Sequence, residues 1–364
     1  MQALLESFSD LPDPRSPRNQ KHPFLSLICI GILGAIAGID SFSGLGDFAE
    51  SHYESLCKLL ELPNGPPSHD TLRRIFDLLD IDAFHDSFTL FTEYLSEQVS
   101  ELIAIDGKRV CNAGTDSPLH LVSAWCESNQ MVLAQKKVAC KSNEITAIPQ
   151  LLSLLDVRGA IVSIDAMGCQ ESIAQQIVDS GGDYLLALKG NQGSLLEDVS
   201  PYFNNLELFD GYSWQECDKG HGRSEERICY ATSNIDYLRT EQHRWPALNT
   251  IAMVISKRTV KGKTTTEKRY YITSLPAHAE RICRAARSHW GIENKLHWRL
   301  DVTYNEDKAC IRNDNAAENM ALLRKWALNI LSKHKGSSST KSLQRKAAMS
   351  FEFLQNLLDN IFHA

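Results

Sequence analysis

Two short apolar runs in the middle of the chain each lead directly into an aspartate, and this repeated pattern limits the fold more than any other feature. Leu102–Ile105 runs into Asp106, and Ala160–Ile164 runs into Asp165. A short apolar run followed by a turn signal is typical of a buried strand. Two neighbouring strands of this kind would bring both carboxylates within reach of one ion at a sheet edge. A single Asp at a strand end also fits a turn-forming or helix-capping role.

The segments around these runs alternate between strand and helix patterns. Residues 119–126 and 131–138 are two strand-like runs separated by a short polar stretch, which is typical of a hairpin. Helical patterns follow near 145–155 and at 170–179, and another strand is expected at 184–188. This alternation predicts an α/β sheet layered with helices.

The sequence on either side of this region shows a different pattern of apolar and polar residues. We predict a helical N-terminal domain at 1–95, with DNA binding as one hypothesis for its role. A catalytic domain is expected at 96–335, with an inserted β-rich segment at about 194–275 that contains the basic turn 257–263. Residues 336–364 are predicted to form a linker and a C-terminal helix.

Composition narrows the class of protein only modestly. The formal net charge of −7 argues against an all-over basic coat, although a nuclease needs only local basic surface. The ten cysteines include no C-x-x-C pair, so reduced thiols are expected. No G-x-G-x-x-G follows a strand and no P-loop is present, which excludes a dehydrogenase or NTPase of the usual kind.

The chain is expected to stay in the cytoplasm without a membrane anchor. Residues 1–10 carry two acids and no base, unlike a secretory signal peptide. The apolar run 24–39 has 16 residues and three glycines, fewer residues than the roughly 20 that a membrane-spanning helix needs. We interpret it as a buried helix.

A third acidic residue lies in the segment 287–298. His289, Glu293 and His297 are spaced by four, so on a helix they share one face. Phosphodiester cleavage by two hard cations requires carboxylate ligands. Glu293 is therefore a candidate ligand, with a solvated glutamate as the alternative. A zinc site formed with the two histidines is disfavoured, because a true H-E-x-x-H is absent.

Basic residues near these acids are candidates to contact DNA, because phosphate contacts position a duplex without reading its sequence. Each has a second interpretation. Lys189 also fits an exposed turn lysine, Arg284 and Arg287 fit a solvated helix face, and Arg223 and Arg227 fit an ion-pair network with neighbouring glutamates. The candidate DNA-contacting residues are Lys189, His221, Arg223, Arg227, Arg284, Arg287 and His289.

Short motifs along nearly the whole chain resemble those of the DDE transposases of bacterial insertion sequences, in the branch that includes the H-repeat-associated proteins. Their order and number make coincidence improbable. The matching stretches are Asp13-Pro14-Arg15 with His22-Pro23, Pro67-Ser68-His69-Asp70-Thr71, Ala104-Ile105-Asp106-Gly107-Lys108, Ile164-Asp165-Ala166-Met167-Gly168, Leu188-Lys189-Gly190-Asn191-Gln192, His221-Gly222-Arg223-Ser224-Glu225-Glu226-Arg227, His289-Trp290-Gly291-Ile292-Glu293-Asn294 and Leu296-His297-Trp298-Arg299-Leu300-Asp301-Val302.

The resemblance implies a ribonuclease-H-like mixed sheet flanked by helices. Asp106, Asp165 and Glu293 would bind two Mg²⁺ ions, which Mn²⁺ can replace. The implied reactions are Mg²⁺-dependent DNA strand cleavage and strand transfer during transposition of an insertion sequence. The implied partners are double-stranded DNA, as element ends and as target, and a second copy of the chain in a homodimer on DNA.

One part of the family pattern is missing. Larger relatives carry a Tyr-x-x-Arg-x-x-x-Glu-x-x-x-x-x-x-Lys signature around their glutamate. This chain has Ala286, His289 and Leu300 in the places of the Tyr, the Arg and the Lys. The alternatives to Glu293, in descending order, are Glu306, Asp307, Asp301 and Glu318.

Two other functions fit the same residues. A two-metal nuclease would hydrolyse nucleic acid with the same carboxylates but without strand transfer. A catalytically silent DNA-binding remnant of a mobile element would keep the fold without the reaction. The sequence alone does not separate these three functions.

Overall fold

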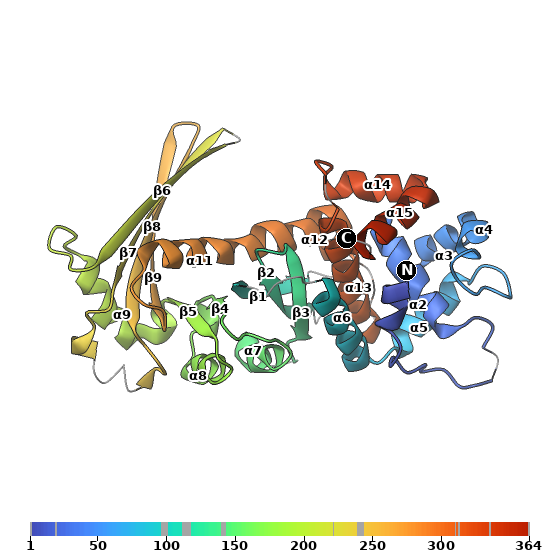
Figure 1. The fold of residues 1–364 in the computed structure, drawn as a ribbon, viewed down its shortest axis with the longest axis horizontal. Helices are drawn as coiled ribbons and strands as arrows, with labels where there is room; N and C mark the ends of the chain where they lie inside the picture. Colours follow the sequence, from blue (N-terminus) through green and yellow to red (C-terminus); the bar gives the residue numbers. More distant parts are fainter. Residues whose placement is uncertain are drawn as a thin grey trace.

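The computed structural model describes residues 2–18, 20–95, 101–110, 118–139, 143–220, 222–238, 244–309, 311, 314–334 and 336–362. The molecule is elongated, with helices at one end, a sheet in the middle and long β-hairpins at the other end (Figure 1). The N- and C-terminal segments both lie in the helical end.

The helical end is built from both ends of the sequence around one apolar core. Trp326 lies at its centre, with its ring 4.3 Å from that of Phe91 and 5.0 Å from that of Phe8. The N-terminal helices are α1 Gln2–Glu6, α2 Phe24–Ile36, α3 Phe42–Ser51, α4 Tyr53–Leu56, α5 His69–Leu78 and α6 Ile81–Leu95. The C-terminal helices are α13 Asp314–Ser332, α14 Thr340–Met349 and α15 Phe351–Phe362.

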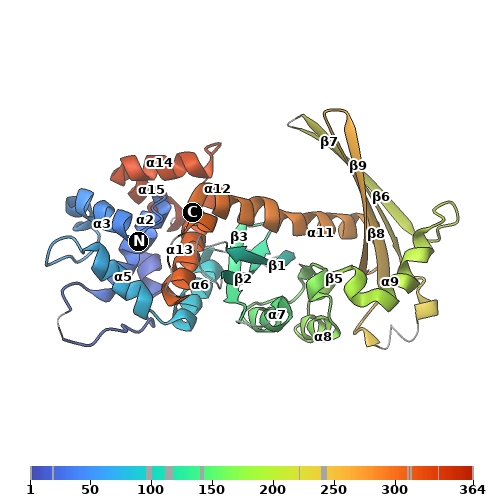
Figure 2. The same ribbon diagram turned by 180° about the vertical axis from the view of Figure 1, so that it is seen from behind.

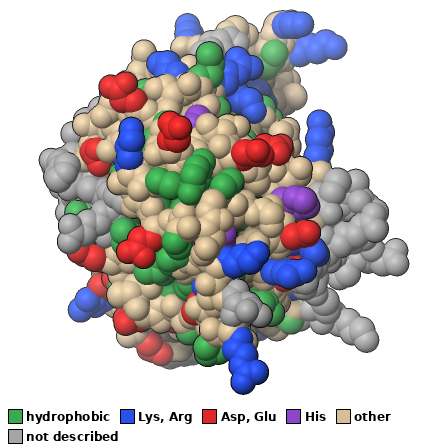
Figure 3. All heavy atoms as spheres, turned by 90° about the vertical axis from the view of Figure 1, so that its right-hand side faces the viewer, with side chains coloured by type: hydrophobic (Ala, Val, Ile, Leu, Met, Phe, Trp, Pro, Cys, Tyr) green, Lys and Arg blue, Asp and Glu red, His purple; other side chains and the backbone are tan. Residues whose placement is uncertain are grey.

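Two expectations for these helices can be compared with the structure. Helix α2 is buried on nearly all sides, which confirms that the apolar run beginning at Phe24 is a core helix. No helix in the described ranges is long and apolar enough to cross a membrane. The segment 336–364, expected to hold one helix, contains both α14 and α15. On the end face of this region, Lys and Arg side chains are interspersed with Asp and Glu around a central apolar patch (Figure 3).

The central sheet has the order β3-β2-β1-β4-β5. Strands β1 to β3 form an antiparallel meander, whereas β1, β4 and β5 run parallel. This arrangement is ribonuclease-H-like and confirms the fold class expected from the sequence. The strands are β1 Leu102–Val110, β2 Leu119–Cys126, β3 Met131–Lys137, β4 Ile161–Ile164 and β5 Asp183–Leu188.

Helices cover both faces of this sheet. Ile103 and Ile105 pack in one apolar cluster with residues of α7 (Glu144–Leu152) and α8 (Glu171–Asp179). Because side chains alternate along a strand, the neighbouring Asp106 points to the opposite face. That face carries the long helix α11 (Ala279–Gly291), which continues through η5 (Ile292–His297) into α12 (Trp298–Tyr304). The remaining short elements are η1 Ala166–Gly168, η2 Gly190–Gln192, α9 Gly193–Val199, η3 Ser200–Phe203, η4 Asp236–Leu238 and η6 Glu306–Lys308.

The expectation that the first strand ends at Asp106 was wrong. Strand β1 continues to Val110, because β2 pairs along its whole length, with Asp106 opposite Ser123. Only the pairing on the β4 side stops early, after Ile105 opposite Ile164. Asp106 therefore lies in a continuous strand at the point where its parallel neighbour leaves the sheet.

Four long strands continue the sheet beyond β5, and we call them the hairpin arm. They are β6 Tyr212–Gly220, β7 Arg223–Thr232, β8 Thr250–Val260 and β9 Lys263–Thr273. Strand β9 pairs antiparallel with β5, and the arm projects well beyond the helices in both views (Figures 1 and 2). The basic turn expected at 257–263 is shorter than predicted, because β8 runs to Val260 and the turn is made by Lys261 and Gly262, both at positive φ.

Candidate active site

Asp106 and Asp165 occupy equivalent positions on two neighbouring parallel strands. Ile105 is the register partner of Ile164, so each aspartate is the next residue after the last paired position. Burial and then the negative charges of Asp165 and Glu293 raise the pKa of Asp106 to about 7. Asp106 is therefore close enough to both of the other acids selected from the sequence for their charges to act on it.

The carboxylate of Asp165 is held by the start of the following turn. Its Oδ1 accepts hydrogen bonds from the backbone N–H of Met167 at 3.0 Å and of Gly168 at 3.4 Å. The Lys-Gly-Asn-Gln turn after β5 is tied to the same loop, because the Asn191 side chain donates to the carbonyl of Ala166. This contact places the turn after β5 beside the turn that holds Asp165.

Glu293 lies in η5, a π-helical stretch that interrupts an otherwise continuous α-helix. Such stretches are rare and frequently mark functional sites. At one end of this stretch, His289 Nδ1 is 3.3 Å from Ser163 Oγ on β4, and at the other end His297 Nδ1 is 3.7 Å from Asp106 Oδ2 on β1. The helix therefore crosses from β4 to β1, with the exposed Glu293 between the two contacts.

Both histidines on this helix are neutral near pH 7. Burial lowers the pKa of His289 to about 4 and that of His297 to about 3. Neutral imidazoles add no positive charge beside the aspartates. The repulsion among the acids is therefore not cancelled by these two side chains.

A fourth carboxylate, Glu144, was missed by the sequence analysis. It is the first residue of α7, and its Oε1 is 2.8 Å from His120 Nε2 on β2. It lies directly over Gly107, where any side chain would overlap the Glu144 carboxylate. The signal that could have found it is Gly107 itself, since a glycine inside a strand often marks the close approach of another group.

We expect Gly107→Ala to destabilise the protein by about 1 kcal/mol, because the new methyl group must displace the carboxylate of Glu144 and so break its hydrogen bond with His120. The measurement is the urea midpoint at constant m-value. Gly190→Ala is the matched control, since nothing lies within 4 Å of a methyl group at Gly190. Equal midpoints for the two variants would show that Glu144 does not press on this strand.

The alternatives to Glu293 are engaged elsewhere. Lys108 Nζ is hydrogen-bonded to Asp301 and, at 2.9 Å, to Glu306, and it lies 3.9 Å from Asp307. Glu318 lies 3.9 Å from a lysine of β3. Glu293, by contrast, makes no ion pair within the described part of the chain.

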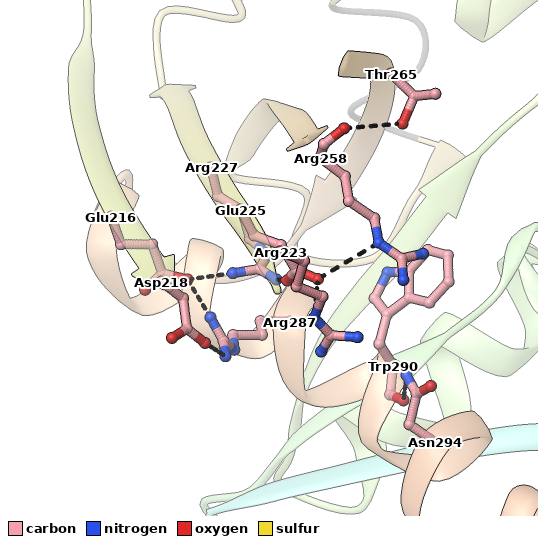
Figure 4. Close-up of polar contacts among 10 residues, drawn as sticks. All are labelled: Glu216, Asp218, Arg223, Glu225, Arg227, Arg258, Thr265, Arg287, Trp290 and Asn294. Atoms are coloured by element: carbon pink, nitrogen blue, oxygen red, sulfur yellow. Dashed lines mark hydrogen bonds and ion pairs between the residues drawn. The ribbon is translucent and has the colours of Figure 1, made fainter. Parts of the chain in front are cut away.

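The candidate DNA-contacting residues fall into four groups, of which the first is His289 alone, half-buried against Ser163 of β4. Lys189 is exposed, and its positive charge helps to lower the pKa of His289. His221 lies outside the described residues. The four arginines are ion-paired, as the alternative interpretation held for Arg223 and Arg227, and Figure 4 shows three of them, Arg223, Arg227 and Arg287. The pairs are Arg223 with Glu225 at 3.1 Å, Arg227 with Glu216 at 3.3 Å, Arg284 with Glu280 at 2.6 Å and Arg287 with Asp218 at 2.9 Å.

The acidic cluster fits a divalent cation by its chemistry. Carboxylate oxygens are the ligands that Mg²⁺ prefers, and a cation would neutralise the repulsion that raises the pKa of Asp106. Within the described ranges, no three His, Cys, Asp or Glu side chains are gathered closely enough to enclose a metal ion. The donor atoms are thus suitable in kind but are not drawn together to coordination distance.

The pKa of Asp106 predicts how the stability of the metal-free protein depends on pH. The folded value of about 7 lies above the ordinary 3.8, so the folded state binds the proton more tightly and stability falls as pH rises from about 4 to 7. Asp106→Asn should remove this loss and be more stable than the wild type at pH 8 in EDTA. Unfolding curves at pH 5 and 8 test this, and a variant with the same pH dependence as the wild type would contradict it.

The sheet order and the crossing helix place the chain in the ribonuclease-H-like class of folds. Two family profiles match its sequence: one described as DDE_Tnp_1-associated at residues 5–92, and one described as the transposase DDE domain at residues 97–330. The chain belongs to this family of DDE transposases, whose DDE domain implies the use of a divalent metal.

Similar proteins cover the full length. The Escherichia coli K12 proteins named "Putative protein YbfL" and "H repeat-associated putative transposase YhhI" are each 37% identical to this chain, over 98% of both sequences. Among solved structures, the piggyBac transposase synaptic complex with hairpin DNA is 13% identical, with a TM-score of 0.44, covering 99% of this chain and 80% of that one.

Proposed function

We propose that this transposase cleaves DNA and joins the freed 3′ end to a target duplex in a single site formed by Asp106, Asp165 and Glu293. The observation that supports this most directly is the β1–β4 register, which sets the two aspartates side by side beneath the helix that carries Glu293. Mg²⁺ is the cation that these ligands suit best, with Mn²⁺ as a substitute.

The bound cations would activate the attacking oxygen and stabilise the leaving oxygen of the phosphodiester. The chain itself supplies the ligands and holds them in place. Two backbone N–H groups fix the orientation of Asp165, and β2 holds Asp106 within a paired strand. Because Glu293 is exposed, it remains accessible to a cation and to DNA.

The hairpin arm has the charge that a DNA-binding surface needs. Strands β6 to β9 and the described residues of their turns carry nine Lys or Arg and five Asp or Glu, whereas the whole chain has a net charge of −7. A local basic surface on an acidic protein attracts the phosphate backbone without coating the whole molecule. We infer that duplex DNA lies along the arm and reaches the acidic site beside Lys189.

Lys189→Ala is expected to weaken binding of duplex DNA about three- to tenfold, because one phosphate interaction is lost. For the same reason, the slope of log K against log salt concentration should become shallower by about one unit. Fluorescence anisotropy at several salt concentrations measures both. Arg158→Ala serves as the control. Arg158 is exposed and precedes β4, whereas Asp165 follows β4, so the two residues lie at opposite ends of that strand. An unchanged affinity in Lys189→Ala would remove this lysine from the DNA path.

The function is tested with DNA that carries the ends of the mobile element, a target duplex and Mg²⁺. Cleavage followed by joining of the 3′ end supports the transposase. Cleavage without joining favours the nuclease alternative, and DNA binding without either reaction favours the silent remnant. Two ends must meet for transposition, so we also propose a homodimer on DNA, which sedimentation of the DNA complex would reveal.

A further inference from the structure

The hairpin arm is attached to helix α11 at three points. At its base, apolar residues of β7, β8 and β9 share a cluster with residues of α11 such as Ile282 and Ala286. Farther along the helix, Arg287 forms ion pairs with β6. Closer still to Glu293, Arg269 of β9 lies over the ring of Trp290, with its guanidinium carbon 4.0 Å from the ring centroid.

Arg287 joins two acidic residues of the arm at once. Its guanidinium donates to Asp218 at 2.9 Å and to Glu216 at 3.2 Å, both on β6 (Figure 4). Glu216 also accepts from Arg227 of β7 at 3.3 Å, and Arg227 in turn contacts Glu225. The hydrogen bond from Arg287 lowers the pKa of Asp218, so both partners keep their charges near pH 7.

The fork geometry matters more than the number of charges. A single exposed ion pair contributes little to stability. A guanidinium shared by two carboxylates, however, restricts the relative orientation of the two elements that it joins, here α11 and β6. The base of the arm is held by the pairing of β9 with β5, which ends at Tyr270, and by apolar contacts with α11, which are not directional. The part of the arm beyond Tyr270 can bend relative to α11 unless side chains join the two. The ion pairs add a second, directional attachment.

We propose that Arg287 is a positioning residue, which holds the hairpin arm at a fixed angle to the helix that carries Glu293. Arg287 precedes Glu293 by six residues on one continuous helix, so the angle of the arm sets the path by which DNA on the arm meets the acidic site. This inference rests on the proposed function for its effect on activity. The attachment itself is independent of that function.

Charge reversal separates this role from a direct phosphate contact. Arg287→Glu and Asp218→Arg should each lower cleavage about tenfold or more, because small misplacements of a bound substrate are costly. The double variant restores the pair between positions 287 and 218 with the signs exchanged, while Glu216 keeps its charge, so it should recover part of the activity lost in the single variants. Arg287 is 41% exposed, so these changes are compatible with folding. A double variant no better than the worse single variant would overturn the proposal.

A distance measurement gives a readout that does not depend on catalysis. Spin labels are attached to non-canonical amino acids that replace Asp86 of α6 and Thr266 of β9. The distance between the two labels reports the orientation of the arm. The distance distribution should be narrow in the wild type and the double variant, and broad in both single variants. Arg284→Glu is the control, since Arg284 is ion-paired within α11, and its distribution should stay narrow. Unchanged distributions in all variants would overturn the proposal even if the wild type showed no cleavage.

Discussion

Replacing any one of Asp106, Asp165 and Glu293 with its amide is expected to lower Mg²⁺-dependent DNA cleavage by at least about a thousandfold. An amide keeps the shape of the side chain but removes the negative charge that holds a cation, and each tenfold loss in rate corresponds to about 1.4 kcal/mol of lost transition-state stabilisation. Cleavage of labelled DNA ends in single-turnover conditions measures the loss, and anisotropy checks that DNA binding survives.

Glu280→Gln is the matched control for this series. Glu280 lies on the same helix as Glu293 but at its start, where it pairs with Arg284. Its replacement should leave cleavage within about twofold of the wild type, as expected of a surface change away from the site. Full activity in Glu293→Gln would contradict the assignment of the third acid and direct attention to the alternatives Glu306 and Asp307, which lie beside Lys108.

Glu306→Gln is expected to destabilise the protein by about 3 to 5 kcal/mol, the usual cost of breaking a buried ion pair on one side. Glu306 is 1% exposed and lies against the half-buried Lys108 and the buried Arg324. Burial opposes its ionisation, but Lys108, Lys325 and Arg324 outweigh burial and lower its pKa. The stabilisation is therefore complete above the ordinary value of 4.5 and is lost as pH falls below it.

The neighbouring Asp307 provides the control for that substitution. It lies 3.9 Å from the same Lys108 but is 42% exposed, so Asp307→Asn should cost no more than about 1 kcal/mol. Urea unfolding of both variants at pH 7 makes the comparison. If Glu306→Gln were as stable as the wild type yet unable to cleave DNA, Glu306 would be a catalytic ligand and our assignment of the third acid would fail.

The centre of the sheet was predictable because β4, β5 and the first half of β1 are mostly apolar. A strand buried on both faces excludes polar residues, so the runs that lead to Asp106 and Asp165 predicted two buried strands. The sequence left open whether these two strands are neighbours, and the register of Ile105 opposite Ile164 shows that they are. The end of β1 was mispredicted, because residues 106–109 are not an apolar run and the strand continues there through its pairing with β2.

The surroundings of the acids were less predictable, because they depend on contacts between distant segments. Glu144 is 38 positions from Asp106 and is brought to it by the packing of α7 under the sheet. The arginines of the arm and of α11 looked equally suited to phosphate or to carboxylate. Only the fold shows that Glu216 and Asp218 of β6 face Arg287.

The central claim is that Asp106, Asp165 and Glu293 form the metal site of this transposase. Its most direct test is anomalous diffraction from crystals of the full chain grown with Mn²⁺ and DNA carrying the element's ends. We expect anomalous difference peaks from Mn²⁺ whose ligands are the carboxylates of these three residues. Mn²⁺ bound instead by Glu306 and Asp307 would contradict the claim, as would ordered DNA at the site with no Mn²⁺ beside Asp106.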